Sequence, residues 1–116
     1  MDGADVDAQR AIGRPVDEAA AAGLRERLRD RLAIADGAAV DDVVAGAYRV
    51  LATAPCMVLA AGLDDVLGVV DRPNMPGTTD EWPNWRLPLP CPLEDLMADE
   101  RVRRVAAALR RPQRLA

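Results

Sequence analysis

The sequence predicts a mostly helical chain with a single buried strand. Leu24, Leu28 and Leu32 recur every four residues among charged side chains, which places them in one narrow apolar stripe of a helix. The run 56–60 is continuously apolar and lies between a proline and a glycine, which is typical of a fully buried strand. No other segment is a good strand candidate, so we expect the partners of this strand to lie outside the chain.

The leucine stripe belongs to a first helix expected over about 16–35. Asp17 suits its first turn, and Gly37 suits its end. The first dozen residues are polar and acidic, and we expect them to be loose.

A second helix is expected over about 41–54, where Asp41 or Asp42 can cap its N-terminus. Its apolar residues cover more than half of its circumference, so we expect burial on several sides. A third helix is expected over about 93–110, with a break near residues 98–99. Between them, residues 69–92 form a long irregular loop that holds most of the nine prolines.

Composition excludes several classes of function. The chain of 116 residues suffices for one small domain, and its net charge of −4 comes from interleaved acidic and basic residues, which disfavours a nucleic-acid partner. There is no His, so the usual general base and the commonest metal ligand are missing, and we expect no metal site.

Targeting signals are not evident in the sequence. The N-terminus is acidic and resembles no secretory leader. The most apolar stretch, residues 56–70, is interrupted by Asp64 and Asp65 and is too short to span a membrane. Cys56 and Cys91 have no partner at zinc-ligand spacing, so a reducing cytoplasm without a disulfide is expected.

The loop carries the residues with functional chemistry. Pro73 and Pro76 fix the backbone on either side of Asn74, and Gly77 after a proline suits a type II turn, which needs positive φ at its third position. The loop thereby presents the Asn74 amide and the Thr78 hydroxyl on a rigid backbone.

A second amide and an aromatic ring follow at Asn84 and Trp85. Amides bind hydroxyl groups, and an amphipathic ring suits the C–H face of a pyranose, so these residues fit a sugar site. The same residues also fit a proline-rich loop whose Trp side chains cover the edge of a core. The residues alone leave both interpretations open.

These motifs resemble the C-terminal signature of glycoside hydrolase family 77, the 4-alpha-glucanotransferases, which are also called amylomaltases or disproportionating enzymes. The resemblance rests on an N-(hydrophobic)-P-G-T segment at 74–78 and on N-W-R at 84–86. The lead-in at 54–59 and the L-D-D-V-L-G segment at 63–68 resemble the family's last barrel strand and the turn after it. Residues 10–54 match more weakly.

The resemblance implies that the chain is the C-terminal piece of a (β/α)8 barrel of the TIM type, spanning all of residues 1–116. It implies transfer of α-1,4-glucan segments between malto-oligosaccharides by a retaining mechanism, in the cytoplasm and without a metal or organic cofactor. No membrane partner is implied. The residues implied to bind the glucan are Asn74, Pro76, Gly77, Thr78, Asn84 and Trp85.

The catalytic carboxylates are expected to be missing from this chain. In the family they lie upstream, and the third belongs to an H-D motif that a chain without His cannot contain. The pairs at 64–65 and 80–81 are not marked as a catalytic pair, so the chain alone is expected to be inactive, with exposed apolar faces that allow self-association. The alternative is a non-enzymatic helical interaction module with an aromatic, proline-rich binding loop.

Overall fold

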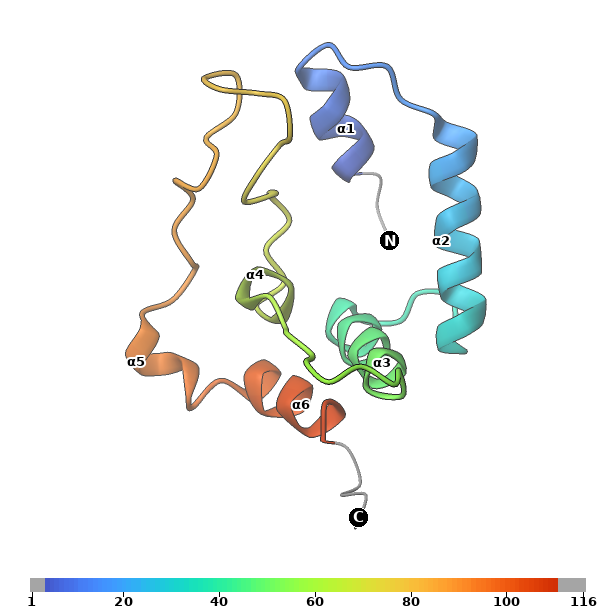
Figure 1. The fold of residues 1–116 in the computed structure, drawn as a ribbon, viewed down its shortest axis with the longest axis vertical. Helices are drawn as coiled ribbons and strands as arrows, with labels where there is room; N and C mark the ends of the chain where they lie inside the picture. Colours follow the sequence, from blue (N-terminus) through green and yellow to red (C-terminus); the bar gives the residue numbers. More distant parts are fainter. Residues whose placement is uncertain (1–3, 111–116) are drawn as a thin grey trace.

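The computed structural model describes residues 4–110, and within that range the chain is built of helices and irregular segments without a strand. The expected range 1–116 extends beyond these residues at both ends. Figure 1 shows the helices in chain order: α1 (Ala4–Ala11), α2 (Glu18–Leu32), α3 (Val40–Ala52), α4 (Leu63–Val66), α5 (Leu93–Leu96) and α6 (Glu100–Ala108).

α2 begins at Glu18, slightly later than expected, and Asp17 precedes it as the N-cap rather than lying in its first turn. The carboxylate of Asp17 accepts a hydrogen bond of 2.9 Å from the N–H of Ala20, which satisfies one of the free donors of the first turn. The helix ends earlier than expected, because Ala33 adopts a left-handed conformation with φ of 50°. Gly37, with φ of 79°, lies in the following turn and does not end the helix.

The expected caps of α3 are wrong. Its N-cap is Ala39, which offers no side-chain acceptor, while Asp41 and Asp42 lie inside the first turn. There the carboxylates interact favourably with the positive end of the helix dipole, but they do not cap a backbone N–H. Acidic residues are favoured both at the N-cap and in the first turn of a helix. The sequence alone therefore does not show which of the two positions Asp41 and Asp42 occupy.

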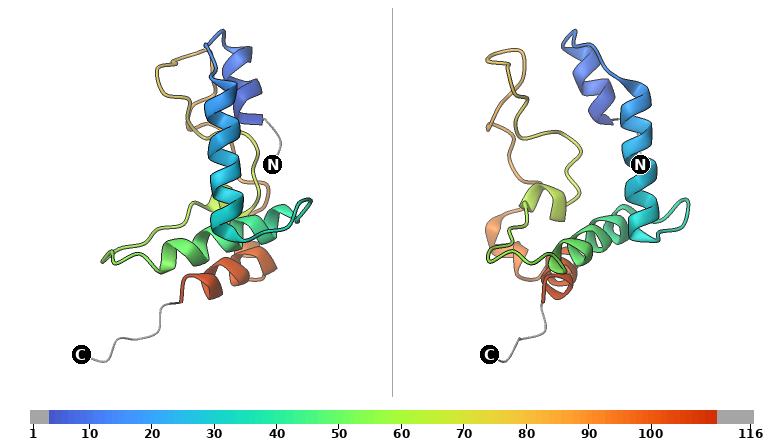
Figure 2. Two further views of the ribbon diagram at one scale, coloured as in Figure 1. Left: turned by 90° about the vertical axis from the view of Figure 1, so that its right-hand side faces the viewer. Right: turned by 45° about the vertical axis from the view of Figure 1, so that its right-hand side comes forward.

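The core lies between α3, α6 and the short helix α4. Tyr48, Val66 and Val105, one from each helix, are buried against one another. The views in Figure 2 show α3 and α6 side by side at one end of the molecule, with α2 running away from them. No residue of α2 is buried: Leu24 and Leu28 of its leucine stripe are exposed, and Leu32, next to α3, is half-buried.

The expected strand at 56–60 is not formed. The segment is irregular, and within it Met57 and Val58 are exposed rather than buried. A strand requires backbone partners on at least one side, and the described part of the chain contains none. The segment is apolar enough for a buried strand, but the described residues provide no sheet that it could join.

The N-terminal segment differs from expectation, whereas the third helix is broken where the sequence suggests a break. Residues expected to be loose form α1, whose Val6 is buried. The helix expected over 93–110 is interrupted at residues 97–99, where Asp99 caps α6 through the N–H of Arg101. No helix within residues 4–110 combines the length and the apolarity needed to span a bilayer.

Candidate functional site

Residues 69–92 form the irregular loop that the sequence predicts. In Figure 1 this yellow-to-orange segment leaves α4, extends past α1 and returns to α5. Two turns, at 75–78 and 83–86, lie on its two limbs. Backbone and side-chain hydrogen bonds join these limbs, so the loop has a defined internal framework.

The first turn has the form that Pro76 and Gly77 predict. The N–H of Thr78 donates to the carbonyl of Met75 at 3.2 Å, and Gly77 has φ of 77°, the positive value that the third position of a type II turn requires. The side chain of Met75 is fully buried, which anchors the turn.

Asn84 connects the two limbs through its side chain. Its Oδ1 accepts a hydrogen bond of 2.7 Å from the N–H of Met75, and its Nδ2 donates to the Oγ1 of Thr78 at 2.9 Å and to the carbonyl of Thr78 at 3.2 Å. The Thr78 hydroxyl in turn donates to the carbonyl of Met75 at 2.7 Å. Both polar groups are therefore engaged inside the loop.

Trp85 stands at an unusual backbone position in the second turn. The N–H of Arg86 donates to the carbonyl of Pro83 at 3.1 Å, and Trp85 has φ of 60°, a left-handed value that bulky residues rarely adopt. Its own N–H donates to the carbonyl of Pro73 at 2.7 Å. The Trp85 side chain is 75% exposed, so it does not cover a core within this chain.

Asn74 differs from Asn84. Asn74 is half-buried, and its side chain makes no hydrogen bond within residues 4–110. An amide carries two donors and an acceptor, so all of its capacity remains available to a ligand. The loop therefore pairs one amide that is used internally with one that is not.

The carboxylates of the loop lack the features of a catalytic acid. Glu81 accepts a hydrogen bond of 2.8 Å from the N–H of Thr79, and this bond is the main reason why the pKa of Glu81 lies below its ordinary value. A general acid at neutral pH needs the opposite shift. Asp80 is exposed and lies 3.9 Å from the guanidinium of Arg86.

The carboxylate of Asp65 has a structural role instead. The hydroxyl of Tyr48 donates to Asp65 at 3.0 Å and accepts from the N–H of Gly62 at 3.1 Å. Burial is the main cause that raises the pKa of Tyr48. The two hydrogen bonds of the Tyr48 hydroxyl connect the start of α4 to α3. Among the described residues, no three acidic or Cys side chains gather closely enough to hold a metal ion.

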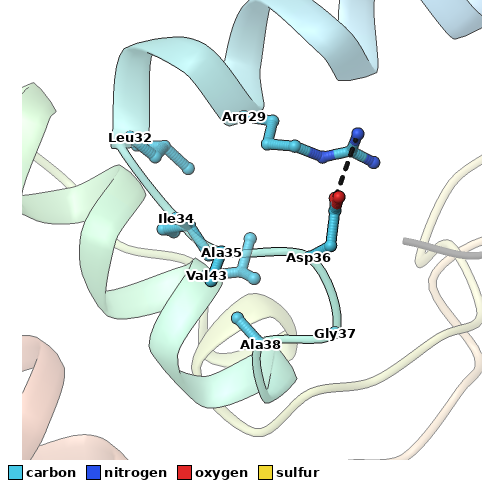
Figure 3. A pocket seen from close by; sticks show the side chains of 8 residues that line it. All are labelled: Arg29, Leu32, Ile34, Ala35, Asp36, Gly37, Ala38 and Val43. Carbon is cyan, nitrogen blue, oxygen red and sulfur yellow. Dashed lines mark ion pairs between the residues drawn. The ribbon is translucent and has the colours of Figure 1, made fainter.

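Two hollows lie elsewhere on the molecule. Figure 3 shows the one at the junction of α2 and α3, where Arg29 and Asp36 form an ion pair of 3.3 Å. Its volume of about 70 Å³ is far below the roughly 300–1,000 Å³ of ligand pockets. The other is an open, arginine-lined groove between α3 and α6. Neither is lined by a residue of the loop.

Three contacts of the loop were not anticipated from the sequence. The guanidinium of Arg14 donates to the carbonyl of Pro76, and Arg72 forms an ion pair of 3.1 Å with Asp5. The indole N–H of Trp82 donates to the carbonyl of Arg72 at 2.8 Å. Each joins residues at least ten positions apart, so no local spacing signals it.

Comparison with known proteins identifies the family. The sequence model of the family described as 4-alpha-glucanotransferase matches residues 14–94. The 4-alpha-glucanotransferases of Mycobacterium bovis and of two strains of Mycobacterium tuberculosis are each 44% identical over 85 residues, covering 66% of this chain and 12% of their own length. No solved structure matches the chain.

These matches place the chain among the glycoside hydrolases. It belongs to the 4-alpha-glucanotransferase family, glycoside hydrolase family 77. The chain spans about an eighth of the length of the curated relatives that it matches.

Proposed function

We propose that this chain is the C-terminal part of a 4-alpha-glucanotransferase and that its loop at 69–92 binds the α-1,4-glucan. One observation carries the proposal. Asn74 has an unpaired amide and Trp85 an exposed indole, and both lie on a loop whose two limbs are held together by internal hydrogen bonds. A rigid loop with an available amide and an open ring matches the hydroxyl rim and the C–H face of a pyranose.

The loop residues divide into two roles in this proposal. Asn74 hydrogen-bonds a sugar hydroxyl, and Trp85 forms a wall against the sugar face. Pro76, Gly77 and Thr78 shape the turn beside Asn74. Asn84 acts through Met75 and Thr78, because its amide hydrogens are already donated inside the loop.

The chemistry proposed for the complete enzyme is retaining transfer of a glucan segment. A retaining mechanism needs a nucleophilic carboxylate and an acid/base carboxyl roughly 5 Å apart. Neither Glu81, with its lowered pKa, nor the exposed Asp80 fits the acid role. We propose that the carboxylates come from a barrel that lies upstream in the complete enzyme. Residues 56–60 would join the sheet of this barrel as its last strand.

The competing function is a helical interaction module whose aromatic loop binds a protein. The exposed indole is compatible with it, but an unpaired amide beside a fixed turn favours a small polar ligand. Titration with maltotriose separates the two, since saturable binding that requires Asn74 supports the glucan and excludes a purely protein-binding loop.

The test compares Asn74→Ala with Asn84→Ala in a complete glucanotransferase that carries these residues. Asn74→Ala removes one sugar contact worth about 1–2 kcal/mol, so disproportionation of maltotriose falls roughly tenfold while the melting temperature barely changes. Asn84→Ala serves as the matched control, because it removes three internal hydrogen bonds and lowers stability as well as activity.

Glucose release and thermal unfolding are measured on the same samples. If Asn74→Ala unfolds the protein and leaves the turnover of each folded molecule intact, the loop is structural and the proposal is wrong.

A further inference from the structure

We propose that Arg14 is a positioning residue, which holds the turn at 75–78 in the conformation that receives the glucan. The proposal rests on the function proposed for the loop. Arg14 belongs to none of the loop's own motifs and precedes α2 by several residues. It reaches the loop across 62 positions of sequence, and its guanidinium donates to the carbonyl of Pro76.

The contact is specific to the turn. Pro76 and Gly77 are its two central residues, so their peptide carries the carbonyl that Arg14 binds. A Cβ atom added to Gly77 would lie 2.6 Å from the Nη2 atom of Arg14, which is closer than atoms tolerate. The guanidinium therefore packs directly on the glycine as well as on the carbonyl.

A second contact also holds the loop against the N-terminal segment. Asp5 of α1 pairs with Arg72 at 3.1 Å, and the carbonyl of Arg72 accepts the indole N–H of Trp82. Figure 1 and Figure 2 show α1 and the residues after it beside the loop. The N-terminal segment thus contacts the first limb of the loop at two points, on either side of Asn74.

Loss of the Arg14 contact has a defined consequence. A hydrogen bond from a guanidinium to a carbonyl is stronger than a neutral one, and nothing else within residues 4–110 binds the Pro76 carbonyl. Without it the turn keeps its internal bond from Thr78 and the bonds of Asn84 to Met75 and Thr78, but it loses its hydrogen bond to the segment that precedes α2. Asn74, two residues before Pro76, would then sample positions that do not meet the sugar.

The experiment uses the fluorescence of the loop itself, because both Trp residues of the chain lie on it. In a Trp85→Phe background the emission of the full 116-residue chain comes from Trp82 alone. Arg14→Met keeps the apolar stem and removes the donor. We expect a red-shifted emission and stronger quenching by acrylamide, with an unchanged far-UV circular dichroism spectrum.

Two matched variants control the result. Arg27→Met changes an exposed arginine of α2 that has no hydrogen bond or ion pair within residues 4–110, and it should leave the emission unchanged. Arg14→Lys retains a donor for the carbonyl and should restore most of the parent signal. If Arg14→Met matches Arg27→Met in emission and quenching, Arg14 does not position the loop and the proposal is overturned.

Kinetics in a complete enzyme test the consequence. Arg14→Met should raise KM for maltotriose roughly three- to tenfold, the effect of one lost hydrogen bond, and leave kcat nearly unchanged. A fall in kcat alone would overturn the positioning role. If the fluorescence responds as expected but Asn74→Ala leaves activity intact, the positioning role is upheld and the glucan assignment is the one that fails.

Discussion

At the scale of single residues, two positions of positive φ shape the loop, and they differ in cost. Gly77 adopts φ of 77° without strain, whereas Trp85 adopts φ of 60° with a large side chain. A left-handed conformation costs a residue with a Cβ atom about 1–2 kcal/mol. Because the Trp85 ring is mostly exposed, burial within this chain does not offset the strain. Strained backbone positions cluster at functional sites in proteins, which agrees with the sugar contact proposed for Trp85.

Trp85→Gly and Trp85→Ala together measure this strain. Both variants lack the ring, but only glycine accepts positive φ freely, so Trp85→Gly should be more stable than Trp85→Ala by about 1 kcal/mol. Trp85→Ala itself should change stability little, in contrast to the roughly 3–5 kcal/mol of a buried aromatic ring. Urea denaturation followed by circular dichroism measures both. A large loss in Trp85→Ala would indicate that the ring is core.

At the scale of elements, α6 is fastened to the turn after α4 by one carboxylate and one guanidinium. Asp99 accepts from the N–H of Arg101 at 2.8 Å and from its Nη2 at 2.6 Å. The Nη1 of Arg101 donates to the carbonyl of Leu67 at 2.7 Å. The cap of the helix and its attachment to the neighbouring turn are therefore one network.

This network predicts a dependence of stability on pH. The hydrogen bond from the Arg101 side chain is the main cause that lowers the pKa of Asp99 from 3.8 to about 2. A lowered pKa in the folded state stabilises the protein fully above pH 3.8, and this contribution is lost as the pH falls toward about 2. Asp99→Asn keeps a helix cap but no charge, so its stability should vary less across that window.

Thermal unfolding of the parent and of Asp99→Asn between neutral pH and pH 2 measures the difference. Equal pH profiles for the two proteins would show that Asp99 is not the group responsible.

The sequence predicts the elements that depend on local chemistry. The start of α2 near Asp17 and the turn at Pro76 and Gly77 follow from the side chains at those positions, and both are present. The interruption of the last helix falls at Asp99, again a capping residue. In each case one or two adjacent residues determine the backbone.

Features that depend on distant residues could not be predicted. The apolar run at 56–60 has the pattern of a strand, but a strand forms only with partners. The exposed ring of Trp85 and the contact of Arg14 with Pro76 depend on which segments meet in space. α1 was missed because its polar sequence resembles a loose terminus, although Val6 is buried.

At the scale of the whole molecule, the chain is more open than a typical domain of its length. Its Cα radius of gyration is 16.1 Å, against about 13 Å for a compact domain of this size. Large apolar side chains remain at the surface, among them Leu24, Val40, Met57 and Val58, the last 82% exposed. Leu24, Met57 and Val58 come from the two apolar patterns that the sequence marks for burial, the stripe of α2 and the segment 56–60, and Val40 begins α3.

We therefore expect the isolated chain to bind a hydrophobic dye and to self-associate. Its sedimentation should depend on concentration, because exposed apolar surface favours association. Val58→Ser should weaken both effects, whereas Val16→Ser, at a half-buried position outside these faces, should not. A cooperative, concentration-independent transition of a monomer without dye binding would contradict this expectation.

The long-range contacts also order the events of folding. Arg14 meets Pro76, and Arg104 meets Asp42, each across 62 positions of sequence. Closing a loop of that length costs chain entropy before any contact stabilises the closed state. Helices form from contacts between residues that are close in sequence, so their cost is lower. The turn that follows Asn74 closes locally through Thr78, but its contact with Arg14 forms only when the N-terminal segment reaches it. The loop at 69–92 is thus expected to be among the last parts of the chain to reach its final structure.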